Sequence, residues 1–148
     1  MRVDINKILT ELSSLPDFKE QLSLQGVFGQ QNYEYGTGKL EGLEHKEEDF
    51  TEFLFDLPYT NSILEKEGMF RTRVMKLKPK SCYTYHKDPT KRKHIPLVTN
   101  YNCFFVVQDE VVRMPANGSV FILDTTKMHT ALNASRKERI HIVGCFKE

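Results

Sequence analysis

Apolar positions follow a helical spacing at the start of the chain and a strand-like spacing in its second half. The residues with helical spacing are Val3, Ile5, Ile8, Leu9, Leu12 and Leu15. They predict a short amphipathic helix. Weak alternation over Gln21–Gln25 favours a strand, and the Gly-rich, polar residues 26–43 favour irregular structure. Two more short helices are expected over Glu47–Leu57 and Tyr59–Glu67.

Short runs of β-branched and aromatic residues, separated by turn-forming residues, fill the second half. They predict strands over residues 70–77, 82–86, 94–99, 103–108, 110–114, 120–123, 130–132 and 139–146. Eight strands at this spacing suggest a mainly β fold, a sandwich or a jelly-roll barrel. We expect one domain over residues 1–148, in which helical and irregular residues 1–68 pack on a barrel formed by residues 69–148. Such a cover would explain why the last run is apolar at nearly every position.

Charge and cysteine content narrow the classes of partner and compartment. The 148 residues include 21 Lys and Arg against 20 Asp and Glu, a formal charge of +1, which disfavours nucleic acid and anionic membranes as partners. No window approaches the roughly 20 apolar residues of a membrane span, and no secretion signal is present, so we expect a cytoplasmic protein. Cys82, Cys103 and Cys145 form no CxxC pair and are interpreted as reduced core thiols.

Two histidines and one aspartate form the main chemical pattern of the sequence. His86 and Asp88 are two positions apart, so in an extended segment their side chains point the same way. His129 follows 43 residues after His86, at the start of another expected strand. Two histidines and a carboxylate make the facial triad that binds ferrous iron and leaves coordination positions open. The alternative for His86 and Asp88 is a solvent-facing pair that braces a turn.

Arg139 lies ten residues after His129, inside the otherwise apolar last strand. A buried arginine is costly unless it binds an anion, and its planar guanidinium suits a carboxylate. We expect the turn at residues 133–137 to return Arg139 beside the strand of His129, where the anion could be a cosubstrate. Tyr83 and Tyr85 have the opposite strand parity to His86 and are expected to pack outside this cavity.

Two stretches, RTRVMKLKPKSCYTYHKDPTKRKHIPLVTNYNCFFVV and NGSVFILDTTKMHTALNASRKERIHIVGCF, combine an HxD motif, an R-x-H strand, H-x-x-x-N and R-I-H. In this combination the sequence resembles the aspartyl/asparaginyl β-hydroxylase family of Fe(II)- and 2-oxoglutarate-dependent oxygenases. The resemblance runs from Arg71 to Phe146. It implies a double-stranded β-helix, which is a cupin-like jelly roll.

The resemblance also implies roles for single residues. His86, Asp88 and His129 would be the iron ligands, and Arg139 would pair with the distal carboxylate of 2-oxoglutarate. His94 would lie near the carboxylate of this cosubstrate.

The substrate side of the site rests on Arg92, which in this family can face the substrate. The basic residues 87–93 around it suggest a substrate with a carboxylate or amide, such as an amino acid or an Asp or Asn side chain in a peptide. The implied activity is hydroxylation of this small or peptide substrate by molecular oxygen. A loop that is merely solvated is the alternative.

Two other classes of function stay open. One is a cupin-type metal enzyme that does not use 2-oxoglutarate, and the other is a non-catalytic jelly-roll binding module. Arg139 distinguishes the first, because that chemistry does not need a buried cation opposite the metal. Binding of Fe(II) and consumption of 2-oxoglutarate distinguish the second.

Overall fold

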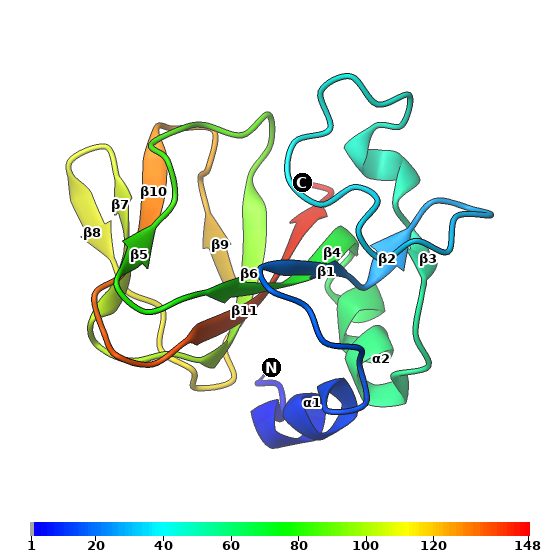
Figure 1. Ribbon diagram of the computed structural model, residues 1–148, viewed down its shortest axis with the longest axis horizontal. Coiled ribbons are helices and arrows are strands. Elements are labelled where there is room, and N and C mark those ends of the chain that lie inside the picture. The colour runs from blue at the N-terminus through cyan, green and yellow to red at the C-terminus, as the bar shows by residue number, and fades with distance from the viewer. Residues whose placement is uncertain (1) are drawn as a thin grey trace.

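Two antiparallel sheets packed face to face, a short third sheet and two helices make up the computed structural model, which describes residues 2–148 (Figure 1). The larger sheet has the order β1 (Gln21–Ser23), β4 (Met69–Leu77), β11 (Arg139–Phe146), β6 (Arg92–Val98), β9 (Phe121–Leu123). The smaller sheet has the order β5 (Ser81–Cys82), β10 (His129–Asn133), β7 (Cys103–Val107), β8 (Glu110–Val112). Strands β2 (Gln25–Gly26) and β3 (Glu52–Phe53) form the third sheet. This is the mainly β, jelly-roll fold that the sequence predicts.

Each of the eight strands expected in the second half overlaps a strand of the structure, with one large difference in length. The run expected over residues 82–86 is regular only at Ser81–Cys82, and its far end makes a single bridge between His86 and His129. The residues between these points follow an irregular path. Side-chain parity therefore cannot be counted through them.

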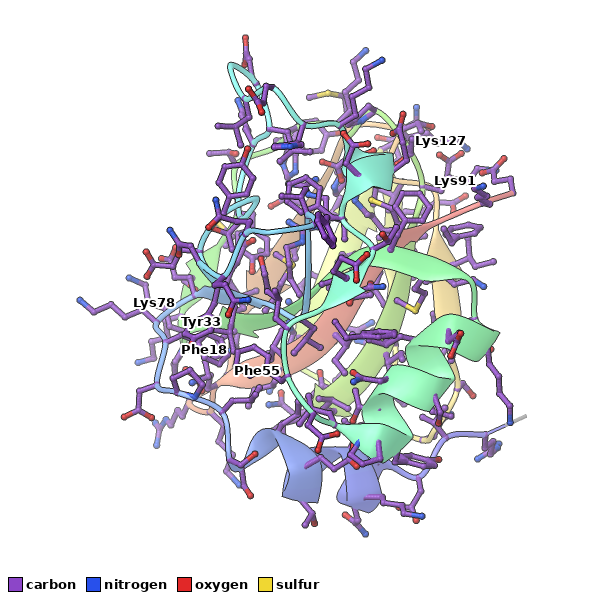
Figure 2. The ribbon with its side chains drawn as sticks, turned by 90° about the vertical axis from the view of Figure 1, so that its right-hand side faces the viewer. Phe18, Tyr33, Phe55, Lys78, Lys91 and Lys127 are labelled. Atoms are coloured by element: carbon purple, nitrogen blue, oxygen red, sulfur yellow. The ribbon has the colours of Figure 1, made fainter. Side chains whose placement is uncertain are left out.

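Helices α1 (Ile5–Leu12) and α2 (Pro58–Lys66) cover the outer face of the larger sheet (Figure 2). Ile142 of β11 packs in one buried cluster with Ile8 of α1 and Leu64 of α2, and all three side chains are fully enclosed. Burying an aliphatic side chain of this size contributes about 1.5 to 3 kcal/mol. The last strand is consequently buried on both faces, as its nearly continuous apolar run predicts.

The two helices are joined by Glu11. Its carboxylate accepts hydrogen bonds from the backbone N–H groups of Tyr59 and Thr60 at 2.9 and 2.7 Å and from the Thr60 hydroxyl at 2.7 Å. These N–H groups lie in the first turn of α2, where they have no partner within the helix. Glu11 thus supplies the anion that a helix N-terminus favours.

The helix expected over Glu47–Leu57 is wrong. Only a 3-10 turn, η1 (Glu47–Asp49), forms there, and β3 follows it. The backbone N–H of Leu54 donates to Leu24 O at 3.0 Å, and Phe50 O accepts from the N–H of Arg71 at 2.7 Å. Bonds to distant strands therefore replace the bonds that a helix would need.

The three cysteines are free, as expected, but they do not share one environment. Cys103 and Cys145 are buried, whereas Cys82 is exposed, so the core prediction is wrong for Cys82. Neither α1 nor α2, nor any other helix in the described part of the chain, has the length and apolar character needed to cross a bilayer.

Candidate metal centre and its cavity

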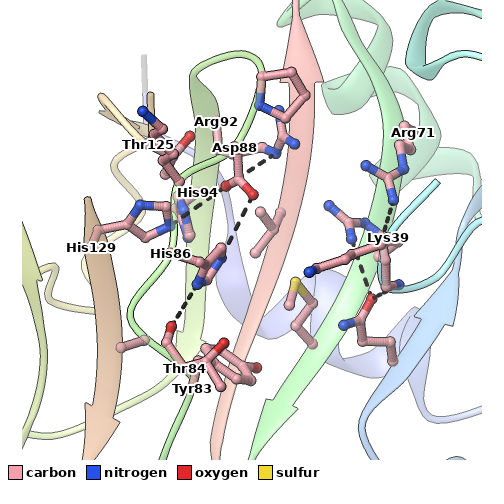
Figure 3. Close-up of a pocket in the computed structure, with 18 of the residues that line it drawn as sticks. Lys39, Arg71, Tyr83, Thr84, His86, Asp88, Arg92, His94, Thr125 and His129 are labelled. Carbon is pink, nitrogen blue, oxygen red and sulfur yellow. Dashed lines mark hydrogen bonds and ion pairs between the residues drawn. The ribbon is translucent and has the colours of Figure 1, made fainter. Parts of the chain in front are cut away.

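The structure brings His86, Asp88 and His129 together (Figure 3). One potential ligand atom from each residue lies within 4.8 Å of the other two. The Asp88 carboxylate stands between the two imidazoles, with Oδ1 3.6 Å from Nε2 of His86 and Oδ2 3.5 Å from Nε2 of His129. Two atoms that bind one metal ion at about 2.1 Å lie about 3 to 4 Å apart. Both distances between the Asp88 carboxylate and an imidazole fall in this range.

Backbone pairing fixes these three residues relative to one another. His86 and His129 exchange both backbone hydrogen bonds, at 3.0 and 2.7 Å, as directly opposed residues of an antiparallel pair. The N–H of Asp88 then donates to Thr125 O at 2.8 Å. The distant histidine is therefore held in register with the HxD pair by the backbone alone.

The hydrogen bonds of the two rings define which nitrogens face the centre. Nδ1 of His86 lies 2.6 Å from Thr84 O, and Nδ1 of His129 lies 2.8 Å from Lys127 O. A carbonyl oxygen only accepts, so each Nδ1 carries the hydrogen and each Nε2 of a neutral ring keeps its lone pair. Two lone pairs and a carboxylate converge without a donor between them. Such a set of acceptors fits a divalent cation.

A cavity of about 760 Å³ opens beside this group, between the two sheets. The larger sheet lines it with alternate residues of three strands. Most of these side chains are basic and buried: Arg71 and Arg73 of β4, Arg92 and His94 of β6, and Arg139 of β11. The wall opposite the candidate metal ligands thus carries positive charge inside the sandwich.

Arg139 reaches this cavity by a different route from the one expected. Strand β11 pairs with β4 and β6 of the larger sheet, so Arg139 faces the cavity from the sheet opposite to that of His129 and does not lie beside its strand. The turn before it is braced by the amide of Asn133, which donates to Leu77 O at 2.9 Å and Lys137 O at 2.8 Å.

The guanidinium of Arg139 is buried and poorly satisfied. Its centre lies 5.6 Å from the ring of Phe105, and its Nε has no hydrogen-bond partner among residues 2–148. Burial lowers the pKa of Arg139. A buried guanidinium with a free donor can bind an anion that enters the cavity.

Tyr83 lines the cavity, which contradicts the expectation that it packs outside. Its hydroxyl is buried and has no partner in the described structure. Burial raises its pKa and the charge of Arg139 opposes that rise, so these two side chains are electrostatic neighbours. Tyr85, by contrast, is exposed as expected.

His94 lies at the base of the cavity wall, against a second buried histidine. Nδ1 of His94 is 3.1 Å from Nδ1 of His141, while its Nε2 is buried without a partner in the described structure. Burial and the charges of Arg139 and Arg92 hold the pKa of His94 well below its usual value. Burial and the charge of Arg139 likewise lower the pKa of His141, so both rings are neutral near pH 7 and one Nδ1 donates to the other.

Arg92 is buried at the start of β6 and is already paired. Its Nη2 lies 2.7 Å from Oε2 of Glu47, and its Nε lies 3.9 Å from Oδ2 of Asp88. The alternative of a merely solvated loop is wrong for Arg92, because its guanidinium is buried in the wall beside the carboxylate of Glu47.

Glu47 also holds the chain segment that covers the cavity, residues 36–47, which we call the roof segment. Oε2 of Glu47 accepts from Nη1 of Arg71 at 3.0 Å, and Arg71 donates through Nε and Nη2 to Gly36 O at 3.2 and 2.9 Å. Gly36 has φ +88°, and a Cβ there would lie 2.2 Å from the ring of Phe50. Only glycine fits this close turn.

Two of these residues carry a signal that the sequence reading missed. Arg71 and Arg73 interrupt an apolar strand at alternate positions, which is the same feature that singles out Arg139. Glu47 has no such signal, because its partners are distant in sequence.

The fold and the site together define a jelly-roll protein with a centre of two histidines and one carboxylate beside a basic cavity. The chain belongs to the aspartyl/asparaginyl beta-hydroxylase family, whose sequence profile matches residues 3–147. The match extends through the first 70 residues, where the sequence motifs gave no resemblance.

Partial structural similarity to several solved structures accompanies this match. A protein from Photorhabdus luminescens aligns over 52% of this chain and 62% of its own, less than two thirds, with 13% identity and a TM-score of 0.44. A cupin domain from Bordetella pertussis Tohama I aligns over 53% and 81%, with 14% identity and a TM-score of 0.45. A predicted oxalate decarboxylase from Thermotoga maritima aligns over 57% and 74%, with 18% identity and a TM-score of 0.41. A sequence comparison with curated proteins found no match.

Proposed function

We propose that the protein is an Fe(II)- and 2-oxoglutarate-dependent hydroxylase of a small or peptide substrate that carries a carboxylate or amide group. The observation that carries this proposal is the pairing, across one cavity, of three convergent metal-ligand atoms with the buried, unpartnered guanidinium of Arg139. Membership of a hydroxylase family supports it. A cupin-type metal enzyme that does not use 2-oxoglutarate has no need for such a cation.

In this proposal His86, Asp88 and His129 hold the iron through Nε2, a carboxylate oxygen and Nε2. The carbonyls of Thr84 and Lys127 keep both imidazoles in the tautomer that can bind a metal. When bound, Fe(II) with 2-oxoglutarate and molecular oxygen supplies the oxidant that hydroxylates a C–H bond, and the cosubstrate leaves as succinate and carbon dioxide.

Arg139 and Tyr83 bind the distal carboxylate of 2-oxoglutarate in this proposal. Each has a buried donor without a protein partner, and a carboxylate accepts from both. His94 adds Nε2–H as a third donor when His141 donates to its Nδ1. Phe105 and Val143, which line the same cavity, exclude water from these bonds and so strengthen them.

The proposal is tested by the release of succinate from 2-oxoglutarate with added Fe(II). We expect His129→Ala to reduce this release at least about 100-fold, because the remaining two ligands hold iron weakly. His45→Ala is the matched control, since His45 bonds to the Tyr35 hydroxyl and is not part of the cavity lining. Release at the parent rate in the His129 variant would show that the metal ligands are wrongly assigned.

The substrate class is tested by a screen of free amino acids and short peptides. We expect members with a carboxylate or amide side chain to increase succinate release, with one oxygen atom added to the stimulating compound. Stimulation only by uncharged, apolar compounds would contradict this part of the proposal.

A further inference from the structure

Four buried side-chain atoms in the described part of the chain lack a hydrogen-bond partner, and all four belong to residues that line the cavity. They are Arg73 Nε, Tyr83 Oη, His94 Nε2 and Arg139 Nε. Buried polar groups are nearly always satisfied in folded proteins, so this concentration in one place indicates a missing ligand. The cosubstrate carboxylates account for the last three atoms in the proposed function. Arg73 stays without an explanation.

Arg73 and Arg139 reach the cavity from different positions along the larger sheet. On β4, Arg73 is opposite Val143, whereas Arg139 is opposite Leu77. Four residues of a strand span about 13 Å. The two side chains therefore start from backbone positions far enough apart for each guanidinium to bind an anion of its own.

No carboxylate in residues 2–148 forms an ion pair with Arg73. Its Nη1 donates to the neutral amide of Gln21 at 3.2 Å, and the residue is only 6% exposed. Arg71 and Arg92 differ from it, because both are neutralised by Glu47. Burial, followed by the charges of Arg71 and Arg92, lowers the pKa of Arg73 to about 9, as expected for a cation without a counter-ion.

The charges of the cavity do not balance around the proposed metal and cosubstrate. When the exposed lining residues are left aside, four buried arginines face two carboxylates, Glu47 and Asp88. A divalent metal adds two positive charges and 2-oxoglutarate removes two, so an excess of two positive charges stays. A further anion has to enter if this excess is to be neutralised.

We propose that Arg73 binds a carboxylate of the substrate and that the cavity thus holds two anions at once, the cosubstrate at Arg139 and the acidic substrate at Arg73. This inference rests on the proposed function and moves substrate recognition from Arg92, which Glu47 occupies, to Arg73. Lys39 of the roof segment lies on the same side of the cavity as Arg71, across from His86, Asp88 and His129 (Figure 3). A carboxylate held by β4 leaves the rest of the substrate directed at the metal centre.

The test uses calorimetric titration of the protein loaded with Zn²⁺, which binds the same ligands and allows no turnover, and saturated with 2-oxoglutarate. The probes are N-acetyl-L-aspartic acid α-amide and N-acetyl-L-asparagine amide, which differ only in a carboxylate against an amide. We expect the acidic probe to bind the parent protein at least about tenfold more tightly than the neutral probe, and Arg73→Gln to remove that difference.

Arg73→Lys and Arg136→Gln complete the experiment. The lysine variant keeps the charge and should keep part of the preference, so it reports on binding even if the glutamine variant does not fold. Arg136 is exposed, and its loss controls for net charge. Equal binding of the two probes by the parent, or an unchanged preference in Arg73→Gln, overturns the inference.

The preliminary titration of 2-oxoglutarate separates this inference from the proposed function. If 2-oxoglutarate binds and the acidic probe shows no preference, only the role of Arg73 fails. If 2-oxoglutarate does not bind, the proposed function fails, and the two probes still test Arg73 in the zinc-loaded protein.

Discussion

Backbone carbonyl groups, and not carboxylates, orient the two candidate histidine ligands. Thr84 O and Lys127 O each lie two residues before the histidine that they accept from. Because the partner is local, each ring is fixed by the conformation of its own segment. The acidic member of the site, Asp88, is therefore free to act as a ligand and does not have to serve as a hydrogen-bond acceptor for either Nδ1.

Arg139→Ala should leave metal binding intact and weaken the binding of 2-oxoglutarate. Removing the charged partner of a buried carboxylate costs on the order of 2 to 5 kcal/mol, which is about 30-fold to several thousand-fold in affinity. Titration of 2-oxoglutarate into the zinc-loaded variant measures this loss. Arg136→Ala, at an exposed position near the start of β11, is the control, and an unchanged affinity in Arg139→Ala would contradict the role assigned to it.

Tyr83→Phe should lower the affinity for 2-oxoglutarate by about 10- to 100-fold, because a hydrogen bond to a charged group contributes about 1.5 to 3 kcal/mol. Fold stability should fall little, since the hydroxyl has no protein partner to lose within the described structure. Tyr85→Phe alters an exposed ring and serves as the comparison. If both variants bind 2-oxoglutarate like the parent, the Tyr83 hydroxyl does not contact it.

At the scale of the elements, η1 contributes one carboxylate, that of Glu47, which forms ion pairs with buried arginines of two strands. Glu47 neutralises Arg71 of β4 and Arg92 of β6, and it also accepts from the Thr90 hydroxyl at 2.9 Å. Burial alone would raise the pKa of Glu47, but the charge of Arg92 and the bond from Thr90 outweigh it and hold the pKa below its usual value. The net effect stabilises the ionised form.

Glu47→Gln should therefore destabilise the protein most above pH about 5, where the Glu47 carboxylate of the parent is ionised in both the folded and the unfolded state. Breaking such a buried pair costs about 3 to 5 kcal/mol. Since the pKa is lower in the folded state, the unfolded chain binds more protons as the pH falls, and the contribution of Glu47 is lost below its unfolded pKa of about 4.3.

Urea unfolding of the parent and of Glu47→Gln between pH 7 and pH 3 measures this dependence. The difference in free energy of unfolding should shrink toward acidic pH. Glu48→Gln, at an exposed neighbouring position, should show no such trend. A difference that stays constant with pH would mean that the ionised form of Glu47 is not what stabilises the fold.

The sequence predicts elements well where one local pattern dominates and fails where distant contacts decide. Strands β4, β6, β7 and β11 follow from their apolar runs, and the HxD pair and His129 stand out as metal-ligand residues at the ends of expected strands. Tyr83 was misplaced because the strand is irregular between Cys82 and His86, where parity has no meaning. The helix expected after Glu47 was misplaced because Leu24, just before β2, and Arg71 of β4 take its backbone bonds.

At the scale of the whole molecule, the helices and the roof segment are part of the barrel's own stability. The outer face of the larger sheet is apolar and is buried under α1 and α2, and on the inner face Glu47 neutralises Arg71 and Arg92. A fragment of residues 69–148 would expose the first surface and leave two buried arginines without a partner. We expect this fragment to show no cooperative unfolding transition, whereas the full chain shows one.

Circular dichroism during heating and amide dispersion in NMR spectra of the fragment and the full chain provide the comparison. A fragment that melts cooperatively would show that the barrel folds alone and that residues 1–68 are a separate addition.

The position of β11 in the larger sheet has a consequence for biosynthesis. This strand lies between β4 and β6, yet it follows both of them in the chain. While the ribosome is still making residues 139–146, the nascent chain presents two unpaired strand edges and an uncovered apolar face. The sheet closes only once these residues are available, and with so many non-local pairings it closes slowly. The newly made chain is therefore expected to depend on chaperones for longer than a helical protein of equal length.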